Sequence, residues 1–373
     1  MSLSERWTGA LEELRGQGRF RSLKLPRGLD FTSNDYLGYG ARVAPTGEPV
    51  MARSGIASRL LRGHHAVWDE VESSLAAWHG ADAVLMMNSG FSANEGLIST
   101  VVEPGDWVAS DELNHACIVE GLRVCRPRKF VFRHNDLNHL EDGLRAEAAK
   151  RPAGRELFIV TESLFSMDGD RAPLCEIVAL AERYGAGVIV DEAHSTGCFG
   201  PGGSGVIDEL GLRDRVLATV HTGGKAIGVT GAYVCGSRLL KDYLVNKCRH
   251  LIFTTALPPI VGNWWLDALD RVRSGDADRE KLHANAAAVH RTLARHSVPT
   301  LGDSYIIPVV LGDDPLAVRV ATRLQERGYD VRAIRPPSVP QGTARLRLSI
   351  HADHDPAVLQ RMAEHVAEAV RDA

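Results

Sequence analysis

The middle of the chain alternates short apolar runs with stretches of helical periodicity, and this alternation constrains the fold more than any other feature. Between residues 83 and 237 the apolar runs are "AVLMMNSG", "WVASDELNH", "KFVFRHND", "ELFIVTES", "GVIVDEAHS", "VLATVHTGGK" and "AYVCGS". Strands that alternate with amphipathic helices predict a mostly parallel sheet covered by helices on both faces. We therefore predict an α/β fold whose large domain is built on such a sheet.

The C-terminal part shows a different pattern. After "TTALPPIVGNWW" we expect a long helix at 279–296, a second at 315–327 and a closing helix from Pro356, with the extended segments "YIIPVVLGD", "DVRAIRPP" and "ARLRLSIH" between them. These elements predict a small α+β domain. The expected organisation is an N-terminal helix and arm at 1–40, a large domain at 41–275 and a small C-terminal domain at 276–373.

Composition excludes several classes of protein. The 373 residues are 44% hydrophobic and 24% charged, as expected for a globular protein. The net charge of −4 gives no electrostatic reason for a nucleic-acid or membrane partner. No apolar run approaches the ~20 residues that span a bilayer, and the N-terminus lacks the apolar core of a secretory signal. The six cysteines form no CxxC pair, so we expect no metal site, reduced thiols and a cytoplasmic location.

Polar residues follow the apolar runs at the positions where the strands should end. In an open α/β sheet the ligand crevice lies beyond the carboxyl ends of the strands, so these side chains are expected to converge on one site. They are Asn88, Asp111, His115, Glu162, Asp191, His194 and Lys225.

Lys225 lies in "VHTGGKAIGVTGAYVCGS", as one lysine among five glycines. A buried ammonium is costly and glycines weaken regular elements, so this segment is either an ordinary loop or one that needs the amine. An amine in such a loop, with Thr222 just before it, suits a Schiff base formed while a phosphate rests on the nearby turn.

Three other features are ambiguous alone. Ser89 and Gly90 open a helix after a strand, where backbone N–H groups bind phosphate, although a plain capped helix has the same pattern. Asp191 ends a buried strand and needs a cation, which is equally consistent with a structural ion pair or a magnesium ligand. His115 after a strand is either an ordinary histidine or a flat ring that lies against a cofactor. Together these parts are what pyridoxal phosphate demands: a lysine, an acid for the pyridinium nitrogen and a phosphate cup.

The sequence resembles the α-oxoamine synthase family of fold-type I pyridoxal-phosphate enzymes. The resemblance covers nearly the whole chain. In family order it includes "FTSNDYLGYG", "SGFSANEGLIS", "DELNHACIVEG", "VTESLFSMDGDRAPL", "DEAHSTGCFGPGGSG", "GGKAIGVTGAYVCGS", "RHLIFTTALPP" and "AIRPPSVPQGTARLRLSI".

The resemblance implies a role for each matching residue. Lys225 would be the Schiff-base lysine, Asp191 would pair with the pyridinium nitrogen, and His115 would stack on the ring. Further cofactor contacts would come from Ser89, Gly90, Phe91, Ser166, His194 and Thr222, with Thr254 and Thr255 supplied by the neighbouring subunit of a homodimer with shared sites. The substrate residues would be Asn34 and Arg347. Arg335 and Arg345 would either contact a substrate carboxylate or form salt bridges in the small domain.

The reaction that the resemblance implies is a decarboxylative condensation of L-alanine with a pimeloyl thioester of coenzyme A or acyl carrier protein. Lys225 would act as the proton shuttle and His115 would assist the loss of CO2. The alternatives are another α-oxoamine synthase, such as a glycine C-acetyltransferase or a secondary-metabolite aminoketone synthase. A non-catalytic cofactor-binding regulator would need a DNA-binding module, and a dehydrogenase would need a dinucleotide fingerprint, which "GPGGSG" in its loop does not provide.

One residue departs from the family pattern. Gly223 stands two positions before the lysine, where relatives usually carry Phe or Leu. The space beside Gly223 is therefore either a void or filled from elsewhere in the chain. If it is a void, Gly223→Phe should raise cofactor affinity.

Overall fold

The computed structural model describes residues 3–16, 20, 22–23, 53–336 and 338–373. Asn34 lies outside these residues. The chain divides into two compact units, Met1–Ser163 with Pro173–Ser274, and Leu164–Ala172 with Gly275–Ala373. The segment 164–172, expected in the large domain, thus groups with the C-terminal unit.

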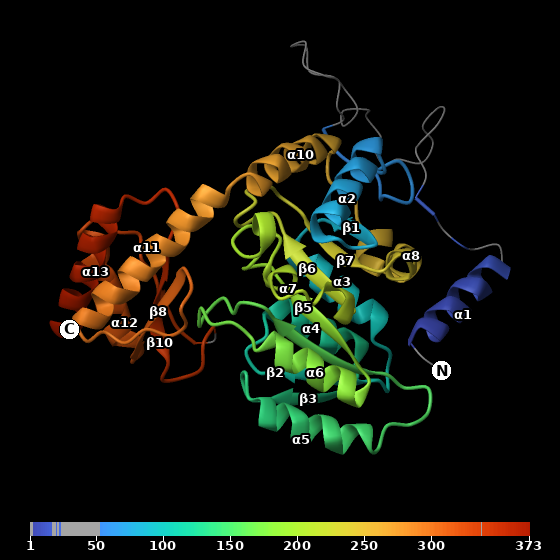
Figure 1. Cartoon of the computed structure of the whole chain (residues 1–373), viewed down its shortest axis with the longest axis horizontal. Helices are drawn as coiled ribbons and strands as arrows, with labels where there is room; N and C mark the ends of the chain where they lie inside the picture. Colours follow the sequence, from blue (N-terminus) through green and yellow to red (C-terminus); the bar gives the residue numbers. More distant parts are fainter. Residues whose placement is uncertain (1–2, 17–19, 21, 24–52, 337) are drawn as a thin grey trace, which may run out of the picture. The chain divides into compact units, whose positions relative to one another are not determined.

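The first unit is built on a seven-stranded sheet of the described residues (Figure 1). The strand order is β1-β7-β6-β5-β4-β2-β3, and every neighbouring pair is parallel except those that include β7. The predicted fold class, a mostly parallel sheet flanked by helices, is confirmed. The strands are β1 (Ala83–Met87), β2 (Trp107–Asp111), β3 (Arg128–Phe132), β4 (Leu157–Glu162), β5 (Ala186–Asp191), β6 (Ala218–Thr222) and β7 (Ala232–Gly236).

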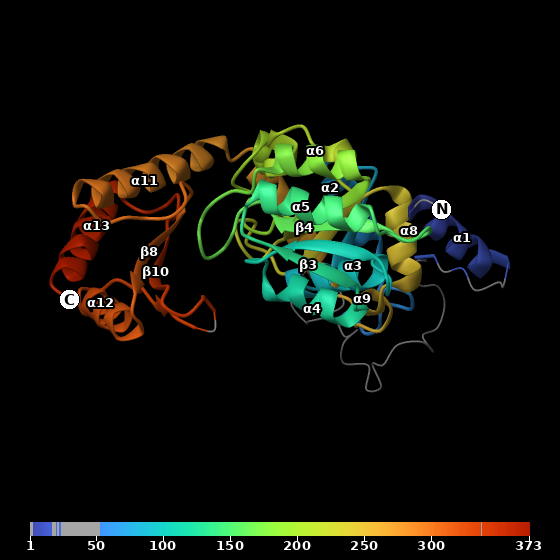
Figure 2. The same cartoon turned by 90° about the horizontal axis from the view of Figure 1, so that it is seen from below.

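Helices cover both faces of this sheet. Leu85 and Met87 of β1 pack into one apolar cluster, whereas Val84 and Met86 pack into another, because successive side chains of a strand point to opposite faces. Figure 2 shows α3 and α4 below the sheet and α5 and α6 above it. The helices of this unit are α1 (Leu3–Gly16), α2 (Ala66–His79), α3 (Gly90–Val101), α4 (Ala116–Cys125), α5 (Leu137–Ala148), α6 (Leu174–Tyr184), α7 (Val206–Glu209), α8 (Arg238–Lys247), α9 (Arg249–Ile252) and α10 (Pro259–Arg273).

Local sequence explains where several helices begin and end. Ser89 caps α3 by accepting a hydrogen bond from Ser92 N, and Asp136 caps α5 in the same way from His139 N. Gly80 and Gly185 end α2 and α6 in the left-handed conformation, which glycine adopts without steric cost. The expected N-terminal helix is α1, which buries Trp7 and Leu11.

The second unit is a small α+β domain, as predicted. Its antiparallel sheet has the order β8-β10-β9, formed by β8 (Ile306–Gly312), β9 (Ala333–Ile334) and β10 (Ala344–Ser349). Its helices are α11 (Asp276–Arg295), α12 (Asp314–Glu326) and α13 (Pro356–Arg371), each within a few residues of its expected range. Within the described residues, no helix of either unit is long and apolar enough to cross a membrane.

Candidate active site

The carboxyl ends of five strands carry the polar residues that the sequence placed there. Because parallel strands end at the same edge of a sheet, the residues after β1, β2, β4, β5 and β6 share one side of the first unit. Hydrogen bonds at this edge join Asn94 to Asp191, the backbone of His115 to Glu162, and Asn88 to the backbone of Thr255.

Asp191 is the last residue of β5 and is only 5% exposed. Its carboxylate accepts hydrogen bonds from Asn94 Nδ2 of α3 at 2.7 Å and from the backbone N–H of Ala193 at 2.7 Å. Both donors are neutral, so these two hydrogen bonds orient the carboxylate without neutralising its charge. Sequence reasoning missed Asn94, which lies one helical turn after Gly90 and therefore faces the strand ends.

Glu162, at the end of β4, lies opposite Asp191 in the strand register. Its Oε1 accepts a hydrogen bond from the backbone N–H of His115 at 2.6 Å. Burial, and then the charge of Asp191, raise the pKa of this carboxyl well above its usual range, while the charge of Lys225 acts in the opposite direction. Burial and the Asp191 charge therefore favour the protonated form of Glu162. The sequence placed Glu162 at this edge but gave it no role.

His115 is the N-cap of α4 and its side chain is exposed. Its Nδ1 accepts a hydrogen bond from the backbone N–H of Cys117 at 3.2 Å and lies 2.9 Å from Cys117 Sγ. Burial raises the pKa of the Cys117 thiol to about 12, so this sulfur keeps its hydrogen. With Nδ1 accepting, the imidazole carries its proton on Nε2, which makes Nε2–H a donor available to a ligand.

The start of α3 lies beside the end of β6. Ser89 and Ser92 form a reciprocal capping box, and a Cβ on Gly90 would lie 3.5 Å from Thr222 Oγ1. The first N–H groups of a helix have no intrahelical acceptor, and the helix dipole makes this end attractive to anions. The backbone of Gly90 and Phe91 together with the Thr222 hydroxyl thus forms a cradle of the kind that binds phosphate.

Lys225 is exposed in the loop between β6 and β7. His194 is half-buried in the turn after β5. Thr255 lies near the same edge, because its carbonyl oxygen accepts a hydrogen bond from Asn88 Nδ2 at 2.7 Å. Thr254 is half-buried next to it.

The remaining predicted residues belong to the second unit. Arg347 Nε donates to the carbonyl oxygen of Ser166 at 2.6 Å, so these two are brought together. Arg345 donates to Asp168 Oδ1 at 2.7 Å and is 4% exposed, so it forms a buried ion pair. Arg335 is exposed after β9.

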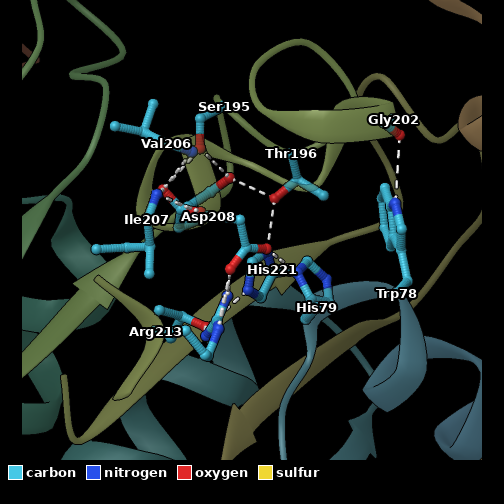
Figure 3. A network of polar contacts seen from close by, with 12 residues as sticks. Trp78, His79, Ser195, Thr196, Gly202, Val206, Ile207, Asp208, Arg213 and His221 are labelled. Carbon is cyan, nitrogen blue, oxygen red and sulfur yellow. Dashed lines mark hydrogen bonds and ion pairs between the residues drawn. The ribbon is translucent and has the colours of Figure 1, made fainter. Parts of the chain in front are cut away.

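Glu192, which lies in the same turn as Asp191 and His194, anchors this turn through hydrogen bonds to three donors. Figure 3 shows the residues that supply these donors, Ser195, Val206 and Ile207. The Glu192 side chain is fully buried, and its Oε1 accepts hydrogen bonds from Val206 N at 3.1 Å, Ile207 N at 3.3 Å and Ser195 Oγ at 3.1 Å. Burial raises the pKa of this carboxyl to about 7, against the opposing charge of Arg213.

Thr196 ties the same turn to β6. Its hydroxyl donates to the Glu192 carbonyl oxygen at 2.6 Å, so it must accept from His221 Nδ1 at 2.8 Å. His221 Nε2 then accepts from the hydroxyl of Thr219 at 2.7 Å, and Thr219 accepts from Arg213. Each hydrogen is used once, so this contact fixes His221 as one neutral tautomer.

His79 extends the network on the far side of Arg213. Its Nδ1 lies 2.8 Å from Asp208, which also pairs with Arg213, and its Nε2 lies 2.9 Å from the hydroxyl of Tyr233. Burial lowers the pKa of both His79 and His221. The ligand atoms of these two histidines lie within 4.8 Å of Cys235 Sγ, but all four ring nitrogens are engaged in hydrogen bonds. This cluster is therefore a hydrogen-bond network and offers no free nitrogen to a metal.

The chain matches the family model "Aminotransferase class I and II" over residues 26–366. It belongs to this family. A relative named 8-amino-7-oxononanoate synthase, from Chlorobaculum parvum, is 42% identical over 377 residues that cover 95% of each chain. A solved 8-amino-7-oxononanoate synthase from Francisella tularensis is 27% identical, with a TM-score of 0.72 over 83% of this chain and 88% of its own. A serine palmitoyltransferase from S. paucimobilis, solved with bound PLP–myriocin aldimine, is 29% identical, with a TM-score of 0.82 over 100% of this chain and 99% of its own.

The residues of this chain fit pyridoxal phosphate. The cofactor needs an acceptor for its ring nitrogen, donors for its phosphate and a lysine amine. Asp191 is oriented by neutral donors, the start of α3 has unshared N–H groups beside Thr222, and Lys225 is exposed at the same edge. The expected family resemblance is confirmed by the comparisons.

Proposed function

We propose that this chain is a pyridoxal-phosphate-dependent acyltransferase of the 8-amino-7-oxononanoate synthase type. It joins L-alanine to a pimeloyl thioester and forms 8-amino-7-oxononanoate, CO2 and a free thiol, a step of biotin biosynthesis. The observation that carries the proposal is the strand-edge arrangement of Asp191, Lys225 and the α3 cradle. It occurs in a chain that matches relatives of this name over nearly its full length.

The cofactor is held by groups from several elements. With pyridoxal phosphate bound, Asp191 would accept a hydrogen bond from the ring nitrogen, and His115 would lie against the ring. The phosphate would be held by Ser89, Gly90, Phe91 and Thr222. When bound, pyridoxal phosphate supplies an electron sink for negative charge on the α-carbon of the amino acid. Ser166 and His194 are assigned to the phenolic oxygen by family resemblance.

The chain's own groups bind the substrate and move its protons. The Lys225 amine takes the proton from the α-carbon of alanine, aided by an exposed position that lets it swing. His115 Nε2–H donates a hydrogen bond to the carboxyl group that leaves as CO2, consistent with the tautomer fixed by Cys117.

Arg347 binds the carboxylate of the amino acid. Its Nε and Nη1 are held by Ser166 and Ser349, which orients the guanidinium fork. Arg335 and Asn34 remain predicted substrate residues.

The active assembly is a homodimer in which Thr254 and Thr255 reach the partner's phosphate. Phe253, directly before them, is 70% exposed and suits a buried interface. The test mixes two inactive variants, Lys225→Ala and the double variant Thr254→Ala/Thr255→Ala. If the sites are shared, exchange of subunits between the two variants should restore activity. If exchange is demonstrated and activity does not recover, shared sites are excluded.

We assign the chain to the cytoplasm. None of the six cysteines, all of which lie in described residues, forms a disulfide, and five of them are buried. Cell fractionation tests this assignment, which recovery of the chain in an extracytoplasmic fraction would contradict.

A panel of substrates tests the activity. L-alanine, glycine and L-serine are each supplied with pimeloyl, acetyl and palmitoyl thioesters of coenzyme A and of acyl carrier protein, and CO2 and thiol release are measured. Turnover should be highest with alanine and a pimeloyl thioester. Turnover of glycine with the acetyl thioester, or of serine with the palmitoyl thioester, in place of this pair would refute the assignment.

A further inference from the structure

The loop that carries Lys225 is a tight closed turn. Gly223 N donates to the Gly231 carbonyl oxygen at 2.9 Å, Val229 N donates to the Gly223 carbonyl oxygen at 2.9 Å, and Gly228 N donates to the Lys225 carbonyl oxygen at 3.1 Å. The first two bonds connect the two ends of the loop, and the third closes a turn that begins at Lys225. Because these bonds lie within the loop, a further contact is needed to hold the loop against the rest of the first unit.

Trp265 of α10 provides this contact. The indole is 1% exposed, and its Nε1–H donates to the Thr230 carbonyl oxygen at 2.9 Å. A Cβ on Gly231 would lie 3.2 Å from this nitrogen, so the ring lies against the backbone at the end of the loop. The ring also meets Tyr233 of β7 edge to face, with centroids 5.5 Å apart.

The indole also occupies the space beside Gly223. A Cβ there would overlap Trp265 Cζ2 and the Val229 carbonyl oxygen, and it would lie 2.7 Å from Trp265 Cη2. Trp265 thus fills the space that a side chain at position 223 would occupy. It comes from α10, which begins 36 residues after Gly223. Ile227 and Val229 of the loop belong to the same apolar cluster as Trp265.

We infer that Trp265 is a positioning residue for Lys225, which fixes the lysine loop by holding Thr230 and by filling the space beside Gly223. The inference rests on the proposed function, because Lys225 matters only if its amine serves the cofactor. It concerns a residue that does not touch the reacting atoms and acts through the loop.

The test uses Trp265→Phe, which keeps an aromatic ring but removes the Nε1–H donor, in the full-length protein. The matched control is Trp68→Phe. Trp68 is equally buried in the same cluster, but its Nε1 has no hydrogen-bond partner among the described residues. The readouts are the dissociation constant for pyridoxal phosphate, the pH midpoint of the visible absorbance of the bound cofactor, and thermal unfolding without cofactor.

Trp265→Phe should weaken cofactor binding by about 3- to 10-fold, as loss of one hydrogen bond predicts, and should shift the pH midpoint. Trp68→Phe should lower thermal stability and leave both cofactor readouts unchanged. Gly223→Ala places a methyl group against the Trp265 indole, so it disturbs the same contact from the loop. It should change the same two cofactor readouts as Trp265→Phe. It serves as the second variant if Trp265→Phe fails to fold.

If wild type binds the cofactor and Trp265→Phe or Gly223→Ala matches it in both cofactor readouts, the inference is overturned and Trp265 is merely structural. The same holds if Trp68→Phe shifts those readouts equally. If wild type itself does not bind pyridoxal phosphate, the proposed function fails as well, so the two failures are distinguishable.

Discussion

Glu162 and Asp191 lie opposite each other in the parallel register of β4 and β5, so two buried carboxyl groups end neighbouring strands. They are not equivalent. Asp191 accepts from Asn94 and Ala193, whereas the Glu162 carboxyl has its pKa raised by burial and by the Asp191 charge. Asp191 is thereby oriented by two neutral donors beside a neighbour whose protonated form is favoured.

Glu162→Gln should preserve both fold and cofactor binding. A protonated carboxyl and an amide are neutral groups of the same shape, and the amide oxygen can still accept from His115 N–H. Glu162→Ala should cost about 1 kcal/mol of unfolding free energy, because the part-buried His115 N–H loses its acceptor. Chemical denaturation of both variants measures the difference, and equal loss in both would mean that the charge of Glu162 is required.

Asn94→Ala should weaken cofactor binding by about 10-fold, because Asp191 loses a charge-assisted hydrogen bond worth about 1.5–3 kcal/mol. Asn94→Asp should be worse, since it places a second negative charge against Asp191. Asn285→Ala is the control: its amide is likewise buried but bonds to His351 in the second unit. Titration of the apo-protein with pyridoxal phosphate checks the prediction, and unchanged affinity in Asn94→Ala would contradict the role given to Asn94.

Glu192→Gln should change how stability depends on pH. The folded state raises the pKa of Glu192 to about 7 and therefore binds its proton more tightly than the unfolded chain does. Wild type should lose stability relative to Glu192→Gln as pH rises from about 4.5 to about 7, with no further relative change above that. The groups that face Glu192 (Arg213, Asp208 and Ser163) are present in both proteins, so the difference isolates this carboxyl. The measurement is the unfolding free energy of both proteins by chemical denaturation between about pH 4.5 and pH 7. A difference between the two proteins that stays constant over this pH range would contradict the prediction.

Gly223→Phe should destabilise the protein by several kcal/mol and should not raise cofactor affinity. The space beside Gly223 is filled by the indole of Trp265 and by the Val229 carbonyl oxygen, so overpacking is expected. The sequence did not decide whether a void lies beside Gly223, and the structure has no void at this position. A tighter cofactor complex in Gly223→Phe, with unchanged thermal stability, would show that the loop has room after all.

Much of the fold followed from local pattern. The apolar runs predicted strands such as β4 and β5 because buried parallel strands are continuously hydrophobic, and the order of strands and helices fixed the class of sheet. The placement of Asp191 and Lys225 at one edge followed from the rule that parallel strands end together. Their roles came from the family resemblance.

Contacts between distant segments were beyond the reach of pattern. Nothing near Gly223 in the chain reveals that Trp265 fills its space, and nothing near Glu192 reveals that Val206 N and Ile207 N bind its carboxyl. Such contacts depend on how separate elements pack. The one signal in the sequence was Glu192 itself. A carboxyl group that follows a buried strand needs hydrogen-bond donors, although the sequence does not show which residues supply them.

The most direct test of the proposed reaction is the mass of the product formed from L-alanine labelled with 13C at every carbon and a pimeloyl thioester. The reaction should give 8-amino-7-oxononanoate that keeps the label of the α- and β-carbons, with the carboxyl label released as CO2, and Lys225→Ala should give no product. A product that retains the carboxyl label, or equal product from Lys225→Ala, would contradict it.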